Sequence, residues 1–171
     1  MQNVKKMMVY KKLKLIIALV LTIVMFQCQE SSNNPGPAVE KSNLIIIREA
    51  QAYADALALL DVSEGSDPFV LKGVKINRDS LTMSINVSYA GGCDKHQFSL
   101  IWPDGIILIY PPNFSVILNH DANGDMCEAW LSETLVIDLR DNSLRLSDQE
   151  IRDMTVTVIN GSNPSEQVQT D

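Results

Sequence analysis

The chain has 171 residues, enough for one ordinary domain and too few for two of average size. Hydrophobic residues make up 46% of it, so a packed core is possible and wholesale disorder is excluded. Acidic residues outnumber basic ones by 21 to 14, and without the five lysines of residues 1–27 the formal net charge falls from −7 to −12. That sign argues against binding nucleic acid through phosphate neutralisation.

The first 28 residues carry the pattern of an export signal. Residues 1–14 contain five lysines and no acid, and residues 15–26 form an apolar run interrupted only by Thr22. Twelve helical residues rise about 18 Å, short of the roughly 30 Å hydrocarbon core of a bilayer. A secretory signal is therefore favoured over a spanning helix. Cys28 follows the run, and residues 28–43 are expected to form a flexible tether because Ser, Asn, Pro and Gly dominate there.

A cysteine placed directly after such an apolar run resembles the signal of bacterial lipoproteins. In that family the signal peptide, here residues 1–27, is removed and the cysteine is acylated. Met25 fits the pattern, whereas Phe26 and Gln27 replace its usual small residues. The resemblance implies lipid attachment at Cys28 and a location in the cell envelope, facing the periplasm or the cell surface. An uncleaved or differently cleaved signal and a buried hydrophobic segment are the alternatives.

Residues 44–66 are expected to form a short helical or extended lead-in, because 44–47 has the composition of a strand and the alanine-rich stretch favours a helix over about 46–60. From residue 67 to 160, apolar and polar residues alternate with a period of two. This pattern predicts a mainly β domain, a single antiparallel β-sandwich of immunoglobulin-like or barrel-like form. Residues 161–171 are expected to be a disordered tail. The expected strands are 70–76, 81–89, 96–102, 106–109, 114–119, 127–131, 134–139 and 154–159.

Two cysteines, Cys93 and Cys127, remain after Cys28. In an exported chain such a pair is expected to form a disulfide. The only two histidines lie close by in the sequence: His96 is three residues after Cys93, and His120 is seven before Cys127. Zinc accepts this combination of nitrogen and sulfur ligands, so a thiolate–metal site is one alternative. A carboxylate–histidine site beside an intact disulfide is another.

The loop at 121–125 has some features of a calcium site. Oxygen-bearing side chains at 121, 123 and 125 match the first three ligand positions of an EF-type loop. The match then fails, because glycine stands at 124 rather than 126 and the twelfth position is Ser132 instead of glutamate. An Asn-Gly turn with an aspartate bonded to its own backbone explains the same residues, and a turn is expected.

Two longer segments resemble a known group of proteins. Residues 89–98 read Tyr-Ala-Gly-Gly-Cys-Asp-Lys-His-Gln-Phe, and residues 123–128 read Asn-Gly-Asp-Met-Cys-Glu. With 67–69 and 137–139 they resemble small uncharacterised bacterial envelope lipoproteins that carry a β-rich domain. The resemblance covers about residues 67–159 and implies export and a β domain, without an activity to carry over.

The predicted function is that of an exported, lipid-anchored envelope domain with a structural or binding role. No catalytic residue and no cofactor are assigned, because the sequence lacks a nucleophile elbow, a phosphate-binding glycine loop and an HExxH motif. A hydrolase with an unrecognised carboxylate pair is one alternative, with Glu128 and Glu133 as formal candidates. The other is a protein that binds zinc or another divalent metal through His96, His120, Asp125 and Glu128.

The two tryptophans, Trp102 and Trp130, are expected to lie in the core or at a strand edge. A sugar-binding platform is the alternative role for such rings. The membrane is the only partner that the sequence indicates, through the acylated cysteine.

Overall fold

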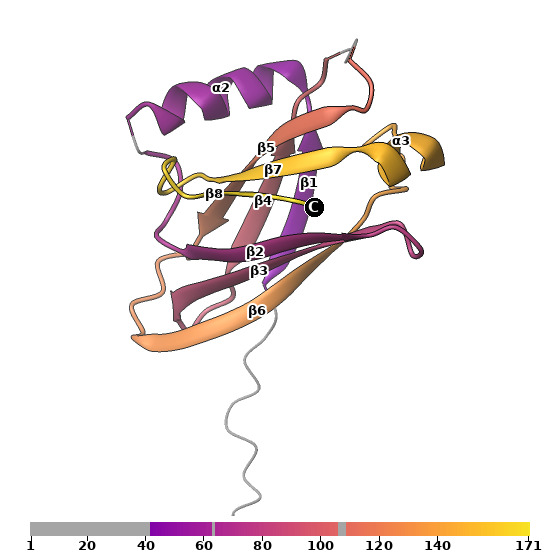
Figure 1. The fold of residues 1–171 in the computed structure, drawn as a ribbon. Coiled ribbons are helices and arrows are strands. Elements are labelled where there is room, and N and C mark those ends of the chain that lie inside the picture. The colour runs from indigo at the N-terminus through magenta and orange to yellow at the C-terminus, as the bar shows by residue number, and fades with distance from the viewer. Residues whose placement is uncertain (1–41, 63, 106–108) are drawn as a thin grey trace, which may run out of the picture. The chain divides into compact units, whose positions relative to one another are not determined.

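A computed structural model describes residues 42–62, 64–105 and 109–171. The predicted signal peptide, Cys28 and nearly all of the expected tether lie outside the described residues. Two sheets build the domain (Figure 1), one of five strands in the order β1-β4-β5-β7-β8 and one of three in the order β2-β3-β6. The elements are β1 (Asn43–Arg48), α2 (Ala50–Leu60), β2 (Val70–Asn77), β3 (Thr82–Gly91), β4 (Gln97–Trp102), β5 (Asn113–Asp121), β6 (Ala129–Asp138), α3 (Asp148–Asp153), β7 (Thr155–Asn160) and β8 (Gln167–Gln169).

The core lies between the two sheets and is filled by alternate residues of each strand, as the period of two predicts. Both sheets contribute to one cluster of fully buried side chains, which includes Met83, Ile85, Phe98, Leu100, Val116, Leu118, Ile137 and Val158. The prediction of a mainly β, sandwich-like domain is confirmed. The sheets are not wholly antiparallel, however, because β1 pairs parallel to β4 and β5 pairs parallel to β7.

The segment expected as a lead-in is an integral part of the fold. Residues 46–48 belong to β1 and not to the expected helix, and β1 forms one edge of the five-stranded sheet. The helix begins at Ala50 and lies on the outer face of that sheet, where Ala56 packs with Ile101 of β4 and Ile117 of β5. Ile47 of β1 packs against the same cluster, which therefore holds both β1 and α2 in place.

The strands expected at 127–131 and 134–139 are one continuous strand, β6, which pairs with β3 along its whole length. Glu133 interrupts the apolar row of β6 that faces the core, which is why the sequence indicated a break there. β6 and β1 are unpaired edges, and a pocket of about 210 Å³ lies between residues of the two, lined in part by Leu44, Glu133 and Leu135. The strand expected at 106–109 falls almost entirely outside the described residues.

The C-terminal segment is ordered, and the expectation of a disordered tail is wrong. Its short strand β8 pairs antiparallel with β7, and the Thr170 hydroxyl accepts a hydrogen bond from the amide of Val156. Arg78 donates to the backbone oxygen of Asp171 at 2.8 Å, which fixes the end of the chain beside the β2–β3 turn. Three residues of strand with a single apolar side chain give too weak a pattern to predict.

Candidate functional site

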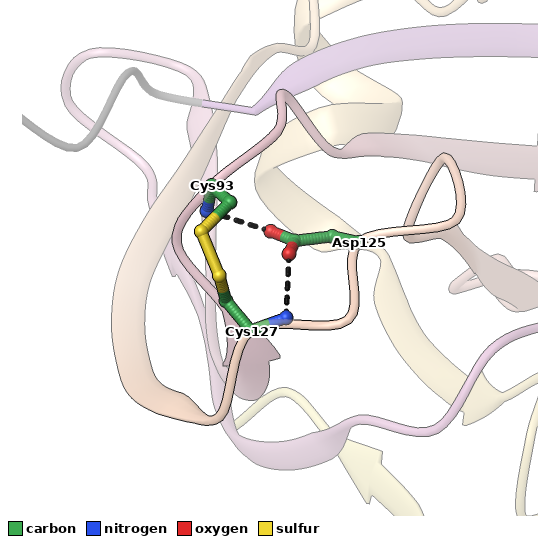
Figure 2. Close-up of side chains that lie close together, drawn as sticks. All are labelled: Cys93, Asp125 and Cys127. Atoms are coloured by element: carbon green, nitrogen blue, oxygen red, sulfur yellow. Dashed lines mark hydrogen bonds between the residues drawn. A yellow bond between two sulfur atoms is a disulfide. The ribbon is translucent and has the colours of Figure 1, made fainter.

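The two predicted disulfide cysteines come together at one end of the sandwich. Cys93 lies just after β3 and Cys127 just before β6, and the two are bonded with their Cα atoms 5.9 Å apart. β3 and β6 are hydrogen-bonded neighbours whose register runs to Gly91 and Ala129, so the pairing brings these two loops side by side. Figure 2 shows the disulfide and the side chain of Asp125, which accepts hydrogen bonds from the amides of Cys93 and Cys127. We call this region, Gly91–His96 with Asp121–Ala129, the disulfide corner.

Asp125 is the centre of the corner. Its Oδ2 accepts hydrogen bonds from the amides of Gly92, Cys93 and Asp94 at 2.7, 2.9 and 3.0 Å. Its Oδ1 accepts one from the amide of Cys127 at 2.8 Å. The amides of Asp94 and Cys127 contribute most to holding the pKa of Asp125 well below its usual range. The carboxylate therefore stays ionised and joins the two loops independently of the disulfide.

The two histidines continue this network into the core. Nε2 of His96 lies 3.1 Å from Oδ2 of Asp125, and Nδ1 of His96 lies 2.8 Å from Nε2 of His120. Both rings occur on core-facing rows, and His120 is paired in register with Phe98. We call the three side chains His120, His96 and Asp125 the histidine chain.

The carboxylate fixes one proton of the histidine chain. An ionised carboxylate only accepts, so Nε2 of His96 carries a proton and donates a hydrogen bond to Asp125. Between Nδ1 of His96 and Nε2 of His120, one nitrogen donates and the other accepts, and the tautomers of the two rings decide which.

The environment of the histidine chain is aromatic and dry. His96 and His120 are 2% and 3% exposed. Phe98 stacks on His120 at 4.6 Å between ring centroids, and Tyr89 lies 4.7 Å from His96. Burial, followed by the neighbouring His96, lowers the pKa of His120. The rings have no exposed face, so the arrangement suits holding the corner in place rather than contact with a substrate.

Glycine is required at the point where the histidine chain meets the β3 strand. Gly91 has φ +155°, and a Cβ there would collide with Nε2 of His96 and come within 3.0 Å of Oδ2 of Asp125. The glycine therefore makes room for the contact between the two side chains. Gly92 also has positive φ, at +117°, and lets the chain turn so that three successive amides point at Asp125.

The structure brings three of the four candidate metal ligands together and leaves the fourth apart. His96, His120 and Asp125 converge, but their ring nitrogens and carboxylate oxygens bond to one another. Glu128 is exposed and takes no part in these bonds. Ligand atoms of Cys93, Asp125 and Cys127 lie within 4.8 Å of one another, yet the two sulfurs share the disulfide and offer no thiolate. Binding a cation here would require breaking either the disulfide or the hydrogen bonds of Asp125.

The loop that resembles a calcium site forms the expected turn. Oδ1 of Asp121 accepts from the amide of Asn123 at 2.8 Å, and the amide of Asp125 bonds to the carbonyl of Ala122. Asn123 and Gly124 have φ values of +54° and +73°, as an Asn-Gly pair allows. Side-chain oxygens of Asp121 and Asp125 therefore already accept hydrogen bonds from backbone amides of the same loop.

The sequence did not predict the role of residues 66–69, which lie directly before β2 and contact His120 and the loop that follows it. The Ser66 hydroxyl accepts from the amide of His120 at 3.0 Å, and Oδ2 of Asp67 accepts from the amide of Ala122 at 2.7 Å. Phe69 then contacts the rings of Phe98 and His120. The Asp-Pro-Phe segment quoted for the family resemblance was the available signal, but it gave no hint of these partners.

No protein-family description and no curated protein matches the chain. Among solved structures, the chain is similar to a Bacteroides vulgatus protein of unknown function, DUF1344, with 14% identity and a TM-score of 0.45 over 77% of this chain and 55% of that one. The chain thus spans about half the length of that protein. It is also similar to a candidate lipoprotein of Bacteroides fragilis, with 7% identity and a TM-score of 0.46 over 76% and 70% of the two chains. Within the described residues, no helix is long and apolar enough to cross a membrane.

Proposed function

We propose that the protein is an exported, lipid-anchored domain of the bacterial cell envelope, with a binding or structural role and no catalysis of its own. The observation that carries the proposal is Cys28, which directly follows a twelve-residue apolar run behind five lysines. Acylation at this residue would anchor the domain firmly, because each buried methylene of an acyl chain contributes about 0.8 kcal/mol.

The arrangement of the chain supports this proposal. Thirteen residues, 29–41, separate Cys28 from the first described residue, Ser42, and at about 3.5 Å for each step along the chain they reach at most about 50 Å. The domain that follows is held by a disulfide, which is stable in an oxidising compartment outside the cytoplasm. The buried histidines have no exposed face, and this favours a structural role for them over catalysis.

Cells fed a clickable fatty acid provide the test. The wild-type chain is expected to be labelled, and Cys28→Ser is expected to be unlabelled and released from the membrane fraction. A matched control is the double variant Cys28→Ser, Ser32→Cys, which keeps a cysteine in the segment but moves it four residues away from the apolar run. Labelling of Cys28→Ser equal to that of the wild type would contradict the proposal. Retention of the unlabelled variant with residues 1–27 attached would favour a signal anchor instead.

Metal binding at His96, His120, Asp125 and Glu128 stays an alternative that the hydrogen-bonded geometry makes costly, since Asp125 would lose amide partners. Metal analysis of protein purified without chelator, followed by melting with and without EDTA, distinguishes the two. Saturating binding at a hundredfold excess over Kd would add about 2.7 kcal/mol to folding, so a melting point unchanged by EDTA is the result expected here.

A further inference from the structure

The outer face of the three-stranded sheet differs from that of the five-stranded sheet. α2 covers part of the five-stranded sheet, but no helix among the described elements lies on the outer face of β2, β3 and β6 (Figure 1). The side chains on this face are mostly hydroxyls and amides, and two apolar residues of β6 stand out among them. Trp130 is 61% exposed and Val136 is 62% exposed.

Trp130 is an exposed residue on an edge strand and not a core residue. The other tryptophan, Trp102, is fully buried, as a core role requires. Across the strand pair, Trp130 lies opposite Ala90, whose methyl group is too small to cover an indole ring. An indole held on a strand and left open to water keeps its ring available for contact with a ligand.

A hollow of about 250 Å³ lies on the same face, and the β6 residues in its lining follow Trp130 along the strand. Its lining includes Lys72 of β2, the β3 residues Asn86 and Ser88, and the β6 residues Ser132 and Thr134. Ser88 and Ser132 share a hydrogen bond of 2.7 Å, and Thr134 donates to Oδ1 of Asn86 at 2.7 Å. The second bond occupies Oδ1 of Asn86, whose NH₂ group can donate two hydrogen bonds.

We propose that this face, formed by Trp130 and the hollow over Asn86, Ser132 and Thr134, binds the sugar rings of an oligosaccharide. A sugar ring presents one face of C–H groups, which packs on an aromatic ring, and an edge of hydroxyls, which both donate and accept hydrogen bonds. The indole supplies the first contact, and the hydroxyls, the amide and the Lys72 ammonium supply the second. A protein partner would instead be expected to need a larger apolar centre than one tryptophan offers.

The spacing sets the length of the ligand. Trp130, Ser132 and Thr134 lie at alternate positions of β6 and therefore on one face. The Cα atoms of Trp130 and Thr134 are separated by four residues, about 13 Å along the strand. That distance matches a di- or trisaccharide, with one ring on the indole and the next over the hollow.

The proposal deepens the binding role proposed above, and its test does not depend on lipid attachment. The detergent-extracted full chain is applied to an array of neutral and uronate-bearing oligosaccharides, and the glycans retained are then titrated against the same protein. Retention of at least one glycan class is expected, with a shift in tryptophan emission on binding. Trp130→Ala is expected to weaken binding at least about tenfold, equal to about 1.4 kcal/mol.

Val136→Ala is the matched control, because it removes an equally exposed apolar side chain from the same strand and face without touching the hollow. Its affinity should stay within about twofold of the wild type. Asn86→Ala should weaken binding, and Trp130→Phe should retain part of it. Retention of no glycan would overturn the proposal, as would equal affinity in the wild type and Trp130→Ala. These outcomes leave the fatty-acid labelling at Cys28 unaffected, so the two proposals fail separately.

Discussion

A side chain at position 91 would occupy the space in which His96 and Asp125 meet. The backbone there has φ +155°, and the missing Cβ leaves Oδ2 of Asp125 free to accept from the ring and from the amides that follow. A single absent methyl group therefore allows a buried carboxylate to be fully hydrogen-bonded. Without these partners the charge would be costly to bury.

Gly91→Ala is expected to destabilise the domain by at least about 2 kcal/mol, because the new Cβ collides with His96 and forces a strained backbone. Gly73→Ala is the matched control, since nothing lies within 4 Å of a Cβ at that position. Urea unfolding of both variants checks the prediction. Equal midpoints for the two variants would contradict it.

At the scale of elements, the alternation of apolar residues predicts most strands but not their partners. β3, β4, β5 and β7 lie close to their expected positions because each has an uninterrupted apolar row. β1 was assigned in part to a helix because its apolar residues are contiguous rather than alternating, which fits a parallel strand covered on both faces as well as it fits a helix. The hydrophobic pattern does not encode which strand β1 joins.

For the candidate site, too, the sequence indicates which residues take part but not which of them make contact. The cysteines, histidines and Asp125 were all identified from residue type and spacing. Their arrangement was not, because the contact between His96 and His120 depends on the β4–β5 register that places Phe98 opposite His120. That register is a property of the strand pair, and residue type and spacing do not encode it. The metal alternative rested on the same residues, whose mutual hydrogen bonds the sequence does not indicate.

The disulfide and Asp125 join the same two loops, and their contributions can be separated. The bond closes a loop of 34 residues, so the double variant Cys93→Ala, Cys127→Ala is expected to lose about 3–4 kcal/mol of stability in the chain-entropy description. The variant should still fold, because Asp125 keeps its four amide partners. Denaturant titration of the variant and of the oxidised wild type measures the difference. Two freely alkylated thiols in protein taken from the envelope would contradict the bond itself.

At the scale of the whole molecule, the protonation of two buried groups, His120 and Asp125, lowers the stability of the domain as the pH falls. The pKa of His120 lies below its ordinary value of 6.5 in the folded domain, so the unfolded chain binds a proton more readily. Stability is therefore complete above about pH 6.5 and declines as the pH falls below it. Asp125, whose pKa is also lowered, adds a second loss as the pH falls below its ordinary value of 3.8.

His120→Gln is expected to reduce the loss of stability below pH 6.5, because the glutamine amide can still hydrogen-bond to Nδ1 of His96 but does not titrate. Its melting temperature should change less than that of the wild type between pH 7 and about pH 5, while both fall further below about pH 4. Calorimetric melts across this range check the prediction. Parallel profiles for the two proteins would assign the acid dependence to other groups.

The proposed lipid anchor would confine many copies of the domain to one membrane surface. The edge strands β1 and β6 would then be exposed to pairing with neighbouring copies. Neighbours that diffuse in two dimensions meet often and in similar orientations, and a bare strand edge is a template on which another chain can extend the sheet. Glu133 points its carboxylate toward the interior at this edge, where one of its oxygens is already without a hydrogen-bond partner. A second strand docked on β6 would bury this carboxylate further, so we expect Glu133 to disfavour extension of the sheet by another copy.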